Sequence, residues 1–282
     1  MKQKNLLSLL LFLIAALTTT AYDFEVDGIY YGFMYNDETG VYVAFPKNDD
    51  YGEEGMISNY NGDMVIPETV YYCGHTYTVK AIGDRAFYYS GITTISIPET
   101  VTYIGENAFN SSCLTRLVIP KSVTVLERWA LAGCSMVESI VVASENPVYD
   151  SRDNCNAVIE TSSNTLIAGC CNTVIPSTVN EIGESAFESQ WQLESITIPN
   201  SVTKIGGSAF AFSGIRSIDI PNSVTSIEDH AFYNCSWLKS LVFPNSVAFI
   251  PDNVCQSCSK LTSVTIPNSV TTIGKEAFSN CI

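Results

Sequence analysis

Short apolar segments with the same spacing of hydrophobic positions recur along most of the chain. Each begins as Leu-x-x-Ile-x-Ile, and this alternation of apolar and polar positions predicts a short β-strand with one buried face. A proline follows at once and ends the strand, because it has no amide hydrogen to donate to a neighbouring strand. The next residues, x-x-Val-x-x-Ile-Gly-x-x-Ala-Phe, predict a tight turn or a single helical turn with the phenylalanine as its buried anchor.

The spacing of these segments indicates that they are copies of one unit. Five of the seven intervals between the motif prolines are 22 or 23 residues long. These prolines are Pro67, Pro98, Pro120, Pro176, Pro199, Pro221, Pro244 and Pro267. A single unit buries too few apolar side chains to offset the entropy of ordering its backbone, so neighbouring units must stack and share a core. The repeat therefore predicts a solenoid of short parallel strands joined by compact returns.

The complete unit resembles a known repeat family. Over about residues 66–282, Leu-x-x-Ile-x-Ile-Pro-x-x-Val-x-x-Ile-Gly-x-x-Ala-Phe is similar to the BspA-type leucine-rich repeat of bacterial surface and secreted proteins. The resemblance implies an α/β-type repeat fold that is mostly β, a leucine-rich-repeat solenoid. It also implies adhesion to host matrix proteins or to other cells, with no catalytic residue, cofactor or metal. Three copies carry Glu127, Glu228 or Pro251 instead of the glycine, so we expect their turns to differ in backbone geometry.

The N-terminal part of the chain lies outside this period. Residues 1–21 contain two lysines, a short apolar run and small residues, which together are typical of a secretory signal peptide. Residues 22–80 contain alternating segments that predict β-hairpins, and hence an N-terminal β-cap on the solenoid of residues 81–282. The acidic stretch at residues 49–54 is interpreted as a solvated loop rather than a calcium site.

The solenoid is interrupted by an insertion at about residues 143–174, which predicts an irregular hairpin. If Glu160 pairs with Thr165 across this hairpin, the register places Cys155 opposite Cys170. An oxidising compartment would then permit a disulfide between these two cysteines.

Half of the 10 cysteines occupy the closing position of the repeat, shortly after the Ala-Phe pair. They are Cys113, Cys134, Cys235, Cys258 and Cys281. In this position we interpret cysteine as a small buried apolar residue with a free thiol.

Composition narrows the classes of function. The 282 residues carry 29 acidic and 14 basic side chains, a net charge of −15, which argues against electrostatic binding to nucleic acid or to anionic lipid. Only 2 histidines, His75 and His230, are available for metal binding or charge-relay chemistry. The sequence also lacks nucleophile-elbow, zinc-protease, dinucleotide-binding and P-loop motifs. We therefore expect a non-enzymatic protein with no metal and no cofactor.

The polar positions of the strands are the predicted partner-binding surface. They point away from the core and are mostly small, and solenoids commonly use such an extended face to bind other proteins. The residues on or beside it that we expect to contact a protein partner are Arg116, Glu194, Thr197, Arg216, Asp219 and Lys239.

Two other functions fit the sequence. Trp191 and Trp237 occupy comparable positions just before the motif leucine, where packing between repeats is the simpler interpretation. If they instead form an exposed stacking platform, the chain is a glycan-binding accessory protein. A third reading is a structural surface repeat without a defined ligand. Exposed apolar ends of a solenoid would also favour self-association.

Overall fold

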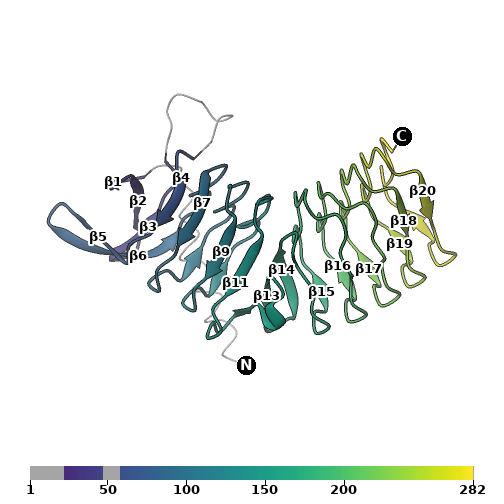
Figure 1. Cartoon of the computed structure of the whole chain (residues 1–282), viewed down its shortest axis with the longest axis horizontal. Coiled ribbons are helices and arrows are strands. Elements are labelled where there is room, and N and C mark those ends of the chain that lie inside the picture. Colours follow the sequence, from purple (N-terminus) through teal and green to yellow (C-terminus); the bar gives the residue numbers. More distant parts are fainter. Residues whose placement is uncertain (1–21, 47–57, 282) are drawn as a thin grey trace. The chain divides into compact units, whose positions relative to one another are not determined.

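A computed structural model of the chain describes residues 22–46 and 58–281. The predicted signal peptide at residues 1–21 and the predicted solvated loop at residues 49–54 lie outside the described residues. The described part is made of β-strands and turns, with a single 3₁₀-helix of three residues. It forms two compact units, each built from short strands in a repeated order (Figure 1). The first contains the described residues up to Ser112 and Ser122–Ala130, and the second contains Cys113–Lys121 and the residues from Leu131 onward.

The first unit begins with the β-hairpins that the sequence predicts. β2 (Ile29–Met34) pairs antiparallel with β1 (Phe24–Val26) and with β3 (Asp37–Val43). β5 (Thr69–Tyr72) pairs antiparallel with β6 (His75–Ile82). The turn between β5 and β6 contains Gly74 at φ +87°, a conformation that glycine adopts without steric cost.

Strand β6 also lies in a parallel stack, in which β3 pairs with it on one side. Its end pairs with β8 (Tyr103–Ile104), which in turn pairs with β10 (Val125–Leu126). Upstream, β4 (Asn61–Val65) already pairs in parallel with β7 (Gly91–Ser96). Because β6 is eight residues long, its beginning pairs with β5 and its end with β8. One strand therefore belongs both to the hairpin region and to the repeats.

Each repeat of the second unit contributes to two ladders of parallel strands. The first ladder is built from the Leu-x-x-Ile-x-Ile segments. It contains β9 (Arg116–Ile119) with β11 (Ser139–Val142), a single bridge between Thr197 and Asp219, and β18 (Ser240–Val242) with β20 (Ser263–Thr265).

The second ladder consists of two-residue strands that end at the isoleucine of the Ile-Gly segment. Its strands are β15 (Glu181–Ile182), β16 (Lys204–Ile205), β17 (Ser226–Ile227), β19 (Phe249–Ile250) and β21 (Thr272–Ile273). The sequence pattern predicts the first ladder but not the second, because two residues are too few to show an alternation.

The motif phenylalanines form the centre of the shared core. The rings of Phe210 and Phe232 are parallel within 2°, with their centroids 5.5 Å apart, and both side chains are fully buried. The amide of each donates to a carbonyl oxygen of the following repeat, as in the 2.8 Å bond from Phe210 to Ala231. The predicted mostly-β repeat fold with a core shared between neighbours is confirmed.

The returns are tight turns in which two residues of each copy have a left-handed backbone. One precedes the motif alanine and the other is the second residue after the motif phenylalanine, as in Ser208 at φ 53° and Phe212 at φ 59°. The copies that lack the glycine keep this pattern, with left-handed residues at Trp129, His230 and Asn253. The expected difference in backbone geometry is therefore absent at these positions.

The motif glycine serves close approach between repeats, not a positive φ. A Cβ atom added to Gly206 would lie only 2.7 Å from the backbone nitrogen of Glu184 in the preceding copy. That distance is too short for two non-bonded heavy atoms, so the absence of a side chain sets how closely these copies stack.

The insertion interrupts the second unit with antiparallel structure. It contains β12 (Tyr149–Asp150), the 3₁₀-helix η2 (Arg152–Asn154), β13 (Ala157–Glu160) and β14 (Thr165–Gly169). β13 pairs with both β12 and β14. β14 then pairs in parallel with β15, so the inserted hairpin supplies one strand of the second ladder.

A β-bulge in the inserted hairpin overturns the predicted alignment of Cys155 with Cys170. Glu160 pairs with Thr165 as predicted, but the register shifts by one residue farther along, where Ala157 pairs with Gly169. The carbonyl oxygen of the residue after Cys155 consequently lies 3.5 Å from the Cys170 Sγ atom. Both cysteines are buried free thiols in the structure. A period of two residues in the sequence does not reveal an extra residue on one strand.

The cysteines at the closing position are mostly buried. Cys134, Cys235 and Cys258 are buried, as predicted, and Cys281 is partly buried. Cys113 is exposed, so the prediction was wrong there. Burial raises the pKa of the Cys235 thiol well above its ordinary value, which keeps this thiol protonated and unreactive.

Candidate protein-binding surface

The first ladder of the second unit exposes every other side chain. In β11, Ile140 and Val142 are buried and Val141 between them is exposed. In β18, Leu241 is buried between two exposed neighbours. This alternation follows from the period of two residues in a strand. We call the exposed side of this ladder the outer face.

All six residues predicted to contact a partner are exposed on or beside the outer face. They are Arg116, Glu194, Thr197, Arg216, Asp219 and Lys239. Glu194, Arg216 and Lys239 follow one another on consecutive repeats. The amide of Arg216 donates to the carbonyl oxygen of Glu194 at 2.9 Å, and that of Lys239 donates to Arg216 at 3.3 Å.

The side chains of Arg216 and Glu194 also form an ion pair, with the guanidinium nitrogen 2.5 Å from the carboxylate oxygen. Their side chains remain 55% and 61% exposed, so water screens the pair and its contribution to stability is small. Both charged groups are accordingly accessible to a partner.

Thr197 and Asp219 lie directly side by side, because their backbones form the bridge between adjacent repeats. Both line a shallow hollow of about 170 Å³ on the outer face. Its other lining residues are Ile196, Ile198, Ile220 and Pro221. Arg116 belongs to an earlier repeat, on β9, where it pairs with Ser139 of β11.

Exposed valines lie on the same outer face. Two residues before the motif proline, or at the equivalent position, the second unit carries Val118, Val141, Val174 and Val242. Val174 is 73% exposed and Val242 is 57% exposed. The outer face thus combines small hydroxyl side chains with separate apolar contact points.

An aromatic cavity lies in the returns beside this surface. It has a volume of about 230 Å³ and is lined by Trp191, Phe212, Ser213, Gly214, Asn234, Ser236 and Trp237. Trp191 is 70% exposed and Trp237 is 51% exposed. The interpretation that these tryptophans pack between repeats was therefore wrong, because both indoles stand largely in solvent.

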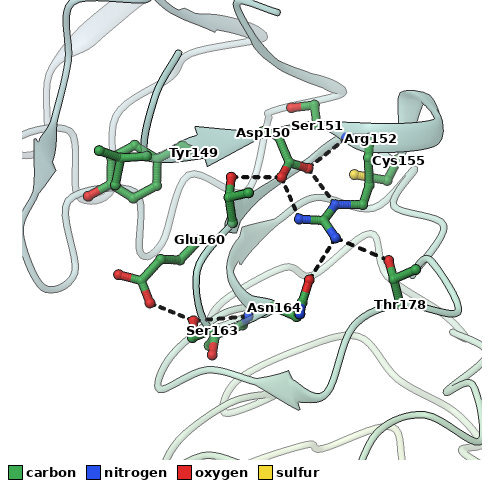
Figure 2. Close-up of polar contacts among 12 residues, drawn as sticks. Tyr149, Asp150, Ser151, Arg152, Cys155, Glu160, Ser163, Asn164 and Thr178 are labelled. Carbon is green, nitrogen blue, oxygen red and sulfur yellow. Dashed lines mark hydrogen bonds and ion pairs between the residues drawn. The ribbon is translucent and has the colours of Figure 1, made fainter. Parts of the chain in front are cut away.

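The insertion is held by a polar cluster centred on Arg152 (Figure 2). Its guanidinium contacts both carboxylate oxygens of Asp150, at 2.7 and 2.5 Å. The same group donates to Asn164 Oδ1 at 2.7 Å and to Thr178 Oγ1 at 3.3 Å. Although burial opposes ionisation of Asp150, the hydrogen bonds from Arg152 and Thr161 lower its pKa below the ordinary value. All three guanidinium nitrogens donate to groups within the protein, so we interpret this cluster as a clamp.

A cleft of about 510 Å³ separates β11 from the clamp. Val141 and Ser144 line it on one side, and Ser151 and Asn156 on the other. The hydroxyl of Ser151 accepts a 2.9 Å hydrogen bond from the amide of Val142, which fixes the inserted segment against the strand.

Groups suited to metal chemistry do not gather in the described part of the chain. Within residues 22–46 and 58–281, no group of three or more His, Cys, Asp or Glu side chains could hold a metal ion. Over the same ranges, none of the helical structure is long and apolar enough to cross a membrane.

The repeats match a known family in sequence. The profile described as BspA type leucine rich repeat region matches residues 73–156 and 164–282, with 6 copies. The chain belongs to this BspA-type family. The residues between the two matched ranges, 157–163, are the strand β13 and the first three residues of the hairpin turn that follows it. The departure from the BspA-type repeat therefore coincides with the inserted hairpin.

Solved structures share the fold of this BspA-type chain. A leucine rich cell surface protein from Faecalibacterium prausnitzii A2-165 is 21% identical with a TM-score of 0.60, and the match covers 94% of this chain and 93% of that chain. The pneumococcal vaccine antigen PcpA is 19% identical with a TM-score of 0.57, over 91% of this chain and 85% of that chain. No functionally curated protein matches the chain in sequence.

Sequence reasoning about the BspA-type repeat missed two features of this surface. Phe212 lines the aromatic cavity although its position follows the motif phenylalanine, where the pattern predicts only a return. The sequence does contain a signal for Phe212, since the equivalent residues of neighbouring copies are the small polar Ser189 and Asn234. The clamp around Arg152 had no such signal, because its partners come from separate segments of the chain.

Proposed function

We propose that the chain is an exported, non-enzymatic module that binds protein ligands through the outer face of its second unit. The partners would be host matrix proteins or proteins on other cells. The family supports a role in protein interaction, and the cell-surface protein from Faecalibacterium prausnitzii with the same fold supports display outside the cell.

The observation that carries the proposal is the row formed by Glu194, Arg216 and Lys239. Three charged side chains project from consecutive repeats, and hydrogen bonds between the repeats hold their backbones in place. The hollow lined by Thr197 and Asp219 lies on the same repeats. A partner would thus meet side chains carried on backbone that needs no ordering before it binds, which reduces the entropy cost of association.

The charges and side-chain sizes on the outer face indicate how a protein partner would bind there. Charges are few and of both signs, so long-range steering contributes little and close contacts must supply the affinity. Exposed Val174 and Val242 offer apolar contact, and the small hydroxyl residues let a partner approach the strand backbone. A shallow extended face of this kind suits a protein surface better than a small substrate.

Export rests on residues 1–21, which carry the pattern of a cleavable signal peptide. If this part of the proposal is correct, the mature protein recovered from its host begins close to Tyr22. N-terminal sequencing of the protein in the extracellular and membrane fractions tests this, and an intact Met1 on the extracellular protein would contradict it.

The binding proposal is tested with immobilised extracellular-matrix extract and purified protein lacking residues 1–21. Variant A replaces Arg116, Glu194, Arg216, Asp219 and Lys239 by alanine. We expect saturable binding by the unmodified protein and at least about tenfold weaker binding by variant A, since contact residues at interface centres dominate affinity.

The matched control carries Glu184→Ala and Lys275→Ala, which are exposed charges in the returns rather than on the outer face. It should bind as the unmodified protein does. Equal binding by variant A and the control would place the partner site elsewhere. A protein that binds no component saturably would favour the structural-coat function instead.

Self-association through the repeats is a separate proposal. Ile266 and Ile273 in the final described repeat are 40% and 51% exposed, so they offer apolar surface to a second copy. Light scattering after size-exclusion chromatography should show dimers that dissociate in Ile273→Lys. A monomer at all concentrations would contradict this proposal.

A further inference from the structure

The aromatic cavity breaks the repeat pattern at two positions on neighbouring repeats. Two residues before the motif leucine or isoleucine, the other regular copies carry serine, as at Ser213 and Ser236, whereas this copy carries Trp191. On the next repeat, Phe212 occupies a left-handed position at φ 59°. A bulky side chain is unfavourable in that conformation, and small polar residues fill it in the adjacent copies.

These departures bring exposed aromatic side chains together around one cavity. Trp191 and Trp237 lie on either side of the repeat that carries Gly214, and all three line the same cavity. A Cβ atom at Gly214 would overlap the carbonyl oxygen of Trp191, so the glycine lets the backbones of these two repeats approach closely at the cavity. Exposed indoles forgo the burial that normally stabilises tryptophan, and this points to a ligand.

The charge around the cavity is opposite to that of the whole chain. The chain carries −15, yet two basic side chains lie over the Trp237 ring. Lys260 has no ion-pair partner among the described residues, and Arg216, which pairs with Glu194, has its Cζ atom 5.9 Å from the ring centre. The ammonium group of Lys260 lies 3.4 Å from the centre of the Trp237 ring. This cation–π contact holds a positive charge at the edge of the cavity and occupies one face of Trp237.

We propose that the aromatic cavity binds an anionic saccharide, with a pyranose ring stacked on Trp191 and its carboxylate or sulfate group beside Lys260. The volume of about 230 Å³ is smaller than pockets for drug-sized ligands and suits one sugar ring. The cavity lies in the returns beside the outer face, and Arg216 borders both surfaces, but the proposal does not depend on protein binding at the outer face.

The lining favours a saccharide over an acidic peptide. A sugar ring has an apolar C–H face that matches a flat indole, and hydroxyl groups around its rim that require polar partners. Ser213, Asn234 and Ser236 supply such partners inside the cavity. The Ser236 hydroxyl donates to Asn234 Oδ1 at 2.7 Å, which orients the amide and leaves its NH₂ group as a donor.

The test uses a glycan array followed by titration calorimetry on the protein without residues 1–21. The probes are oligosaccharides ending in a uronic acid, in sialic acid or in a sulfated hexose, each with its neutral counterpart of the same length. We expect binding of at least one anionic probe, weakened at least about tenfold in Trp191→Ala because the stacking surface is lost. The three anionic probes distinguish carboxylate from sulfate recognition.

Two further variants separate the roles of the residues. Lys260→Gln should lose about fivefold in affinity for the anionic probe and leave the neutral counterpart unaffected, since only the charge contact is removed. Trp129→Ala and Lys275→Gln remove the same side-chain types outside the cavity and should bind normally.

The results of these binding experiments would either support or overturn the saccharide proposal. Quenching of tryptophan fluorescence by the anionic probe in unmodified protein, shifted to about fivefold higher probe concentration in Lys260→Gln, would support it without relying on the Trp191→Ala variant. Absence of saturable binding to every probe would overturn it. Binding that Trp191→Ala and Lys260→Gln leave unchanged would overturn it too, as would saturable binding of acidic peptides alone that both variants abolish.

Discussion

The rings of Phe187 and Phe210 are stacked, with their centroids 5.2 Å apart and their planes within 2° of parallel. Both side chains are fully buried, and the amide of Phe187 donates to the residue just before Phe210 at 2.7 Å. One repeat therefore fixes the next through a ring contact and a backbone bond at the same level. Because every copy depends on its neighbour in this way, damage to one copy should spread to those beside it.

Replacement of the central ring of this stack should strongly destabilise the second unit. Phe210→Ala removes a ring that contacts both Phe187 and Phe232 and leaves a cavity. We expect the free energy of unfolding to fall by about 3–5 kcal/mol. Phe212→Ala makes the same chemical change two residues away on an exposed side chain and should cost less than about 1 kcal/mol. Chemical denaturation of both variants checks this, and equal losses would contradict the stacked core.

Two adjacent glycines should respond differently to the same substitution. A Cβ at position 206 would lie 2.7 Å from the backbone nitrogen of Glu184, whereas at position 207 its nearest neighbour is 3.4 Å away. Gly206→Ala should therefore cost about 1–3 kcal/mol through overpacking of rigid backbone. Gly207→Ala should be nearly neutral. Thermal unfolding of the two variants measures this difference, and a reversed order would contradict the stacking distance.

The clamp in the insertion should stabilise the protein through an ionised Asp150. Its carboxylate accepts from Arg152 and from Thr161, so Asp150→Asn should lower the free energy of unfolding at neutral pH by about 1–3 kcal/mol. Asp153→Asn, an exposed neighbour on the same turn, is the matched control and should change stability little. Denaturant titration at neutral pH compares the three proteins.

The contribution of this clamp should depend on pH in one direction. The pKa of Asp150 is lowered in the folded protein below its ordinary value of 3.8. The stabilisation is thus complete above that value and is lost as the pH falls through the lower pKa of the folded state. The difference in stability between unmodified protein and Asp150→Asn should shrink only in this acidic range. A difference that shrank towards alkaline pH would contradict the ion pair.

Exposed cysteines should react with a thiol-labelling reagent faster than buried cysteines do. Cys73 and Cys113 are exposed and should react with iodoacetamide in the native protein, whereas Cys235 and Cys258 should react only after unfolding. Burial also raises the pKa of the Cys155 thiol to about 11, so this residue should stay protonated and slow to react near neutral pH. Peptide mapping by mass spectrometry measures each site. A mass lower by two hydrogens before reduction would reveal a disulfide instead.

Much of the fold could be predicted from the sequence, because the same pattern of apolar and polar positions recurs in many copies. The spacing of the prolines and of the buried Ile and Phe positions reports contacts between neighbours only about 23 residues apart. The exposure of Glu194, Arg216 and Lys239 follows from the same repeat, since each directly follows the buried leucine or isoleucine of its copy. Where the pattern of one copy leaves the assignment of a strand or a turn ambiguous, the same pattern in the neighbouring copies supports one assignment.

The tertiary structure decided the features that occur once. The bulge that separates Cys155 from its predicted partner adds one residue to a single strand, and no periodic signal marks it. Similarly, the exposure of Trp191 depends on whether the adjacent repeat covers it, and Gly214 does not.

The sequence by itself thus determined the repeating strand, its buried face and the shared core. The tertiary structure decided the register of the insertion, the clamp around Arg152 and the open aromatic cavity. The physical reason is that periodic burial is a local property summed over many equivalent copies. A bulge, a clamp or a cavity instead depends on one set of contacts between distant residues, for which the chain holds no second example.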